Sequence, residues 1–534
     1  MQRETILARV GWGIAVLAGQ LAVSPISGAA TIAEANPSFD LYEIRVLGNT
    51  VLGSRDVERA VYPFLGRGKH LSDVEQARDA LADAYRKHGF ATVYIDIPEQ
   101  AVGDDGVVRL AVTEGRVGRV VVRGAHYFSG REIKAGVPAV APGTVPNVTE
   151  FQHELGDLAR AAADREVTPI LKPSREVGQL DVTLDVKDHA PFHGSIEADN
   201  RYTADTSQTR LNATVSYDYL FDRPQSLALQ YQIAPQAPSE VKVWALNWTA
   251  RSRDSANAWA AYAVKSDSDV AAIGTLSVIG RGKIAGVRRI LVPISDPTYG
   301  LSFTLGGDYK TFNEAINVPS GPPAVTPIHY AVWAAGLNGY LRSSAWAFDG
   351  SLTANAGLRG LVNQDEDFSF KRYGASGSFI YWRGNGTLRY TVLKAFSVSL
   401  RGEAQYAATP LIANEQFALG GVDTVRGYLE AETLVDRGVA GSLEFSSLPV
   451  ALWPAHAETT AFKGFLFLDG GRGSIEQSLP GQANSYHLAS YGVGAQLGGG
   501  REFAAQLAWA RAFADGVRTR AGDSKLHFSV QVGF

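Results

Sequence analysis

The sequence has 534 residues, of which 45% are hydrophobic and 19% are charged, with a net charge of -4 and no cysteine. This length allows about three or four domains of ~150 residues each. The balance of 50 Lys and Arg against 54 Asp and Glu provides no strong positive field, so we expect no nucleic acid partner. The absence of cysteine excludes disulfide scaffolds, thiolate nucleophiles and Cys-ligated zinc or iron–sulfur sites.

Residues 1–30 have the order of a secretory signal peptide. Arg3 and Arg9 precede an apolar run at 10–23, and small residues follow, so we expect cleavage after Ala29 or Ala30. A membrane anchor is the alternative, but about 14 apolar residues would span only ~21 Å of a ~30 Å hydrocarbon core. No later run reaches ~18 apolar residues, so we expect no spanning helix in the mature chain.

After a short N-terminal segment, 31–40, two similar α+β modules are expected at 41–115 and 116–188. The first consists of a strand at 42–49, helices at 54–65 and 72–88, and strands at 91–98 and 106–115. Ser72 and Glu75 have capping-box spacing, and Gly89 is placed to end the second helix. The order repeats with a strand at 118–124, cap spacings at Ser129 and Asn147, and strands at 167–174 and 178–188. Two β-α-α-β-β units about 75 residues apart predict a tandem array, although two unrelated α+β domains would also fit.

Residues 189–534 are predicted to form an all-β domain, a transmembrane antiparallel β-barrel of about 16 strands. Apolar and polar residues alternate in runs of about ten, which are separated by turn residues. A large soluble β-sandwich would alternate in the same way. Aromatic residues near the strand ends favour the barrel, because they fit interfacial girdles: Tyr202, Phe221, Tyr231, Trp382, Trp453 and Trp509. The mean hydropathy of -0.06 fits a barrel in which every second residue faces water.

Two motifs support a family resemblance. Val425-Arg426-Gly427-Tyr428, preceded by Gly420-Gly421, is similar to the VRGY/F motif in the sixth extracellular loop of the outer-membrane assembly and secretion superfamily. Phe467, Asp469 and Gly471 match that superfamily's F-x-D-x-G strand motif. The modules resemble its polypeptide-transport-associated (POTRA) domains. Two modules, rather than three or five, indicate the two-partner secretion (TpsB) transporters, which export haemolysins and adhesins.

The resemblance implies a latch between Arg426 and Asp469, which would fix the loop at about 409–438 inside the pore. Strand alternation agrees, because Phe465, Phe467 and Asp469 face the lumen if Leu466 and Leu468 face lipid. A buried guanidinium needs such a partner. The terminal Phe534 resembles the signal that outer-membrane proteins present to their assembly machinery.

The expected function is type V secretion, in which the POTRA domains capture an unfolded exoprotein and the barrel passes it across the outer membrane. The partners would be an exoprotein with an N-terminal secretion domain, outer-membrane lipid, and the assembly machinery and periplasmic chaperones during biogenesis. Two alternatives remain, an insertase of the same superfamily and a passive porin or receptor. We expect no enzyme, no cofactor and no metal.

Three smaller expectations complete the interpretation. The ten histidines show no helical metal-binding spacing. Asp365-Glu366-Asp367 is interpreted as a solvated turn, with weak calcium binding as the alternative. About ten residues, 31–40, precede the first strand, and a ten-residue helix would span only ~15 Å, so we predict that no plug helix threads the barrel.

Overall fold

The computed structural model describes residues 38–534, except 177, 205, 253–255, 269, 274–275, 317–323, 394, 453–460 and 499–501. Three predictions concern residues outside this set. They are the signal peptide at 1–30, the absence of a plug helix in 31–40, of which only 38–40 are described, and the interfacial position of Trp453. Contacts divide the chain into two compact units, one of residues 1–117, 143–150 and 174–180 and the other of the remaining residues. No helix in the described part has the length and apolarity needed to cross a membrane.

The first module has the predicted strand, two helices and two strands in order, with two additional short strands that pair with each other. It contains β1 Phe39–Leu41, β2 Glu43–Leu47, α1 Ser54–Val61, η1 Tyr62–Phe64, β3 Gly66–Lys69, α2 Leu71–Lys87, β4 Val93–Asp96 and β5 Val107–Glu114. In its sheet, β5 lies between β2, which is parallel to it, and β4, which is antiparallel. Buried Val74, Leu81 and Tyr85 on α2 pack against Leu110 on β5.

The start of α2 differs from the prediction. The capping residue is His70 rather than Ser72, and the backbone N–H of His70 donates to Asp73 Oδ2 at 2.8 Å. Asp73 therefore has the role expected of Glu75, because the capping pair lies two residues earlier than its sequence pattern indicated. Gly89 ends the helix with a φ of +88°, a conformation that glycine adopts readily.

The second module repeats the order of β2, α1, α2, β4 and β5, without counterparts of β1 and β3. It contains β6 Arg116–Arg123, α3 Gly130–Ala135, η2 Pro138–Val140, α4 Val148–Ala161, β7 Arg165–Pro173 and β8 Gln179–Asp188, and its sheet order is β6-β8-β7. Asn147 caps α4 as predicted, since its Oδ1 accepts the N–H groups of Thr149 and Glu150 at 3.1 and 3.2 Å. Ser129 precedes α3 but makes no side-chain cap hydrogen bond.

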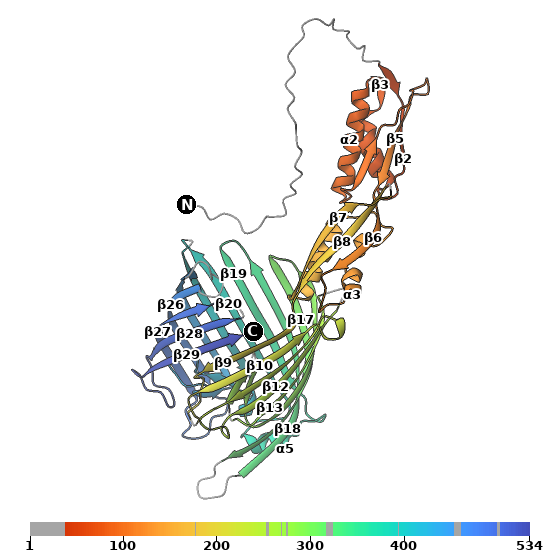
Figure 1. The fold of residues 1–534 in the computed structure, drawn as a ribbon. Coiled ribbons are helices and arrows are strands. Elements are labelled where there is room, and N and C mark those ends of the chain that lie inside the picture. Colours follow the sequence, from red (N-terminus) through yellow and green to blue (C-terminus); the bar gives the residue numbers. More distant parts are fainter. Residues whose placement is uncertain are drawn as a thin grey trace. The chain divides into compact units, whose positions relative to one another are not determined.

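The rest of the chain closes into an antiparallel barrel of sixteen strands, with the two-residue β25 Val450–Ala451 as an addition (Figure 1). Closure excludes the β-sandwich, and it leaves no open sheet edge in lipid. Strands β14 Val270–Ile273 and β15 Leu276–Ile279 form a separate hairpin. The barrel strands are β9 Phe192–Asp199, β10 Arg210–Asp218, β11 Gln225–Ile233, β12 Lys242–Arg251, β13 Ala258–Ser266, β16 Gly282–Ser295, β17 Tyr299–Ile316, β18 Ala324–Arg342, β19 Trp346–Gly357, β20 Phe379–Val392, β21 Phe396–Ala407, β24 Arg437–Ser447, β26 Ala461–Ser474, β27 Ser485–Gly498, β28 Phe503–Ala512 and β29 Ser524–Gly533.

The predicted alternation sorts side chains between the two faces of the barrel wall. On β21, Leu400 and Tyr406 are more than half exposed on the outer face, whereas Gln405 is buried on the inner face. Phe221, Trp382 and Trp509 are exposed, as expected of interfacial aromatics. Tyr202 is an exception, because its ring lies 4.1 Å from Nζ of Lys525, a residue on the inner face of β29. A position close to a strand end does not show whether an aromatic residue lies on the outer or the inner face of the barrel.

One interpretation is wrong. Residues Asp365, Glu366 and Asp367 form the first turn of a helix, α5 Asp365–Lys371, rather than a solvated turn. Hydrogen bonds from Arg359, Ser376 and the Gly377 N–H lower the pKa of Asp365 to about 2. The helix is held by Phe368, which is buried among barrel side chains that include Tyr330 and Phe379. At seven residues, α5 was too short for its periodicity to be recognised.

Candidate functional site

The loop between β21 and β24 folds back against the inner wall of the barrel. It contains η4 Ala413–Glu415 and a hairpin of β22 Phe417–Leu419 and β23 Thr433–Val435. Leu419, Val425, Tyr428 and Val435 are fully buried, and they pack with wall residues such as Leu488. This packing resembles a protein core, so the loop is a fixed part of the lumen in this structure.

Three predicted loop glycines allow this compact path. Gly420, Gly421 and Gly427 have φ values of +104°, +107° and +91°, which residues with a Cβ adopt only with strain. A Cβ at Gly421 would lie 2.2 Å from Glu430 Oε2. The Gly427 N–H donates to Nε2 of His527 on β29 at 3.0 Å, so the tip is also attached to the last strand.

The structure brings Arg426 and Asp469 together. Arg426 Nε donates to Asp469 Oδ2 at 2.7 Å, and Nη2 donates to Oδ1 at 2.8 Å. The Arg426 backbone N–H also donates to Oδ2, at 3.1 Å. Both side chains are almost completely buried. Two parallel charge-assisted bonds fix the orientation of the guanidinium as well as its position.

Other wall residues complete the surroundings of Arg426. Its Nη2 donates to Ser442 Oγ at 2.9 Å, and Glu444 Oε2 lies 3.4 Å from Nη1. The guanidinium carbon lies 3.4 Å from the ring centroid of Phe467, a cation–π contact. Phe467 and Asp469 are two residues apart on β26, so one strand supplies both the aromatic face and the carboxylate. Leu466 and Leu468 are exposed on the opposite face, in agreement with the predicted parity.

The other predicted site residues, Tyr428, Gly471 and Phe534, each make a defined contact with the barrel or the loop. Tyr428 is fully buried, and its Oη lies 2.7 Å from the Ala514 carbonyl oxygen and 3.0 Å from that of Ala489. A Cβ at Gly471 would lie 2.6 Å from Leu419 Cδ1, so this glycine provides room for the loop. The Phe534 N–H donates to the Gly194 carbonyl at 2.9 Å, which extends the seam between β29 and β9 to the last residue.

Sequence reasoning missed two buried carboxylates at the base of the loop. Glu415 accepts hydrogen bonds from Lys310 Nζ at 2.7 Å, from Tyr330 Oη at 2.5 Å and from Tyr381 Oη at 2.7 Å. Asp436 accepts two bonds of 2.6 Å from Arg372, the residue after α5. Strand parity identifies Lys310, Tyr330 and Tyr381 as lumen-facing, but no sequence signal pairs them with a loop residue.

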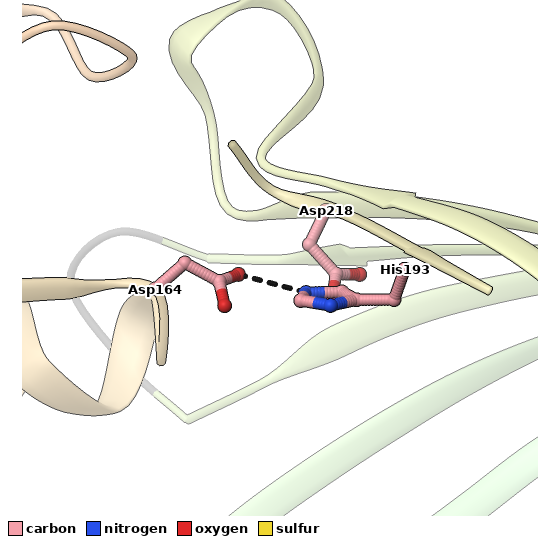
Figure 2. A group of neighbouring side chains, drawn as sticks. All are labelled: Asp164, His193 and Asp218. Atoms are coloured by element: carbon pink, nitrogen blue, oxygen red, sulfur yellow. Dashed lines mark hydrogen bonds and ion pairs between the residues drawn. The ribbon is translucent and has the colours of Figure 1, made fainter. Parts of the chain in front are cut away.

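A separate cluster lies at the start of the barrel and could offer ligands to a divalent metal ion (Figure 2). His193 on β9 places Nε2 2.9 Å from Oδ2 of Asp164, which precedes β7, and 3.7 Å from Oδ2 of Asp218 on β10. One imidazole and two carboxylates suit zinc or manganese, but an ordinary ion pair explains the same contacts. Spacing along the sequence could not reveal this cluster, because the residues come from three distant segments.

Comparisons with known proteins agree with this architecture. Residues 39–115 match the family model described as POTRA domain, ShlB-type, and residues 324–497 match that of the haemolysin secretion/activation proteins ShlB/FhaC/HecB. Over these two segments the chain is similar to the two-partner secretion (TpsB) transporters. The second match includes Arg426 and Asp469, and the TpsB transporters are secretion channels rather than a known family of enzymes.

Whole-chain similarities extend beyond these two segments. The outer membrane transporter CdiB of Dickeya dadantii is 24% identical over 424 residues, which cover 75% of this chain and 71% of that protein. The structure of CdiB from Escherichia coli has a TM-score of 0.63 at 18% identity and covers 95% of this chain and 93% of that one. BamA from Haemophilus ducreyi lacking POTRA domains 1–3 has a TM-score of 0.55 at 12% identity, over 93% of this chain and all of that one. Both structures share the fold. The chain is located in the outer membrane, with its N-terminal POTRA module in the periplasm.

Proposed function

We propose that this protein captures an unfolded exoprotein in the periplasm and passes it outward through the barrel lumen. The observation that carries the proposal is the buried pair of Arg426 and Asp469, whose two parallel hydrogen bonds, together with the packing of the loop's apolar side chains, hold the loop inside the lumen. We assign the latch role to this pair, with Val425, Gly427 and Tyr428 as its packed neighbours. The proposed domains are those expected from the sequence, two modules at 41–115 and 116–188 and a barrel from 189.

Capture requires a free sheet edge, because an extended segment can join it through backbone hydrogen bonds. In the second module the edge strands are β6 and β7. Pro169 and Pro173 lie in β7, and proline cannot donate to an added strand. Strand β6 has eight residues and no proline. We therefore assign capture to β6, beyond Val117, whose backbone already bonds Thr144 and Gly143.

The cysteine-free sequence permits a direct test of this edge. Single cysteines would replace Arg123, at the end of β6, and Lys172, on β7, both of which are exposed. An exoprotein that carries one cysteine in its secretion domain should crosslink to the cysteine at position 123 and not to that at 172. Equal crosslinking at both positions would contradict capture at β6.

The overall proposal is tested by gene deletion. We expect the exoprotein encoded next to this gene to remain in the periplasm when the gene is deleted and to appear outside the cell when it is restored. Secretion without this protein would refute the transporter proposal. Loss of other outer-membrane proteins, with normal secretion of the exoprotein, would indicate an insertase instead.

A further inference from the structure

The lipid-facing surface of the barrel has a pair of lysines at its outer end. Strand β9 begins at Phe192, four residues after the second module ends, so this end of the barrel is periplasmic. Following the antiparallel strands, Lys265 near the end of β13 and Lys283 near the start of β16 lie at the opposite, extracellular end. Both share strand parity with Leu246, Ala263 and Ala285, which face outward.

The two lysines stand directly opposite each other in the register of β13 and β16. Like charges in such a cross-strand pair repel each other. Asp267 lies 3.6 Å from Lys265, but Lys283 has no ion-pair partner in the part of the chain that the structure describes. At the boundary of the membrane, the pair leaves an unbalanced positive charge that an external anion would neutralise.

An apolar groove adjoins the lysines on the same surface. It is lined by Trp244 and Leu246 on one side and Tyr309 on the other, with the small residues Ala263 and Ala285 between them. Trp244 is paired with Lys265, and Ala263 with Ala285, so the groove runs from the charged end toward the membrane interior. Its shape and chemistry fit an acyl chain below an anionic headgroup.

We propose that this groove binds a phosphorylated glycolipid of the outer leaflet, with a phosphate between Lys265 and Lys283 and an acyl chain over Ala263 and Ala285. A soluble phosphate would leave the apolar part of the groove unused, and an uncharged lipid would leave the lysines without a counter-ion. Trp244 suits the boundary, because tryptophan favours the membrane–water interface. The inference rests on the outer-membrane location and does not depend on the transport route.

The test measures binding of a fluorescent, doubly phosphorylated lipid A to the full-length protein in detergent micelles. Lysines near an anionic surface contribute about five-fold each to affinity, so Lys265→Gln with Lys283→Gln should weaken binding by about 25-fold. The matched control is Lys87→Gln, which removes an exposed positive charge from α2 in the periplasmic module. The variant with arginine at both positions should retain binding.

Two further measurements, with dephosphorylated lipid A and with inorganic phosphate, identify the ligand. Dephosphorylated lipid A should bind the wild-type protein as weakly as the double glutamine variant binds the phosphorylated form, and inorganic phosphate should not displace the bound lipid. Equal binding by the wild type and the double glutamine variant would refute the proposal, as would full displacement by inorganic phosphate. If the double variant fails to fold, as judged by its gel mobility before and after heating, Lys283→Gln alone should still weaken binding about five-fold.

Discussion

At the residue scale, the buried pair of Arg426 and Asp469 joins the loop to the barrel wall by two parallel hydrogen bonds. Removal of one member leaves an unpaired buried charge, which costs about 3 to 5 kcal/mol, whereas removal of both avoids that penalty. We therefore expect Arg426→Ala and Asp469→Ala each to lower the heat-induced unfolding temperature in detergent, and the double variant to be no less stable than either. An additive loss in the double variant would show that the two side chains act independently.

The latch proposal also makes a prediction about transport. Arg426→Ala should reduce secretion of the exoprotein by more than ten-fold, since about 3 kcal/mol of loop anchoring would be lost, while the amount of folded barrel in the outer membrane changes little. Arg426→Lys should be intermediate, because an ammonium cannot form the two parallel bonds of a guanidinium. Parallel loss of secretion and of folded barrel would make the pair purely structural.

A second anchor at the base of the loop can be tested separately. Glu415→Gln removes the charge that balances Lys310 and should destabilise the folded barrel by about 2 to 4 kcal/mol. The matched control is Glu403→Gln on β21, which replaces a lumen-facing carboxylate that has no ion pair among the residues described here. If both variants unfold at the same temperature, the network around Glu415 does not anchor the loop.

At the element scale, the turn after β6 depends on one carboxylate. Asp188, the last residue of β8, accepts the backbone N–H groups of His126, Tyr127 and Phe128 at 2.9 to 3.1 Å. Burial alone would raise the pKa of Asp188, but the three N–H groups outweigh burial and lower it. Because the folded pKa lies below the unfolded value of about 3.9, the stabilisation is present above about pH 4 and is lost as the pH falls through the folded pKa.

Hydrogen exchange of the full-length protein in detergent measures this effect. At pH 6, Asp188→Asn should reduce protection of residues 126–128 relative to the wild type. The difference between the two proteins should shrink as the pH is lowered below about 4, because the wild-type carboxylate is then protonated. A difference that is the same at all pH values would contradict the assigned role of the charge.

Periodicity predicted most elements and missed those that depend on tertiary contacts. Strand parity correctly separated Leu466 and Leu468 from Phe467 and Asp469, since a two-residue repeat is a property of the strand itself. The helix α5 was missed because it is stabilised by Phe368, which packs against residues from distant strands. At the start of α2, His70 and Asp73 have the roles expected of Ser72 and Glu75, because β3 ends at Lys69 and the helix begins at Leu71.

At the scale of the whole molecule, repetition and motif order predicted the tandem modules and the closed barrel. The buried carboxylates Glu415 and Asp436 could not be predicted, because Lys310 and Arg372, the cations that pair with them, lie 105 and 64 residues away in the sequence. The same limitation applied to the cluster of Asp164, His193 and Asp218. Such contacts are determined by the way the loop and the strand ends meet in space, which single-sequence patterns do not encode.

The central claim is that the exoprotein passes through the lumen, and adjacent residues on β21 test it directly. Ser399 lies on the polar face, and Leu400 is 53% exposed on the outer face. The measurement is crosslinking of single cysteines at these two positions to an exoprotein stalled during export by a folded domain fused to its C-terminus. We predict a crosslink from position 399 and none from position 400. A crosslink from position 400 alone, or equal crosslinking from both positions, would contradict a route through the lumen.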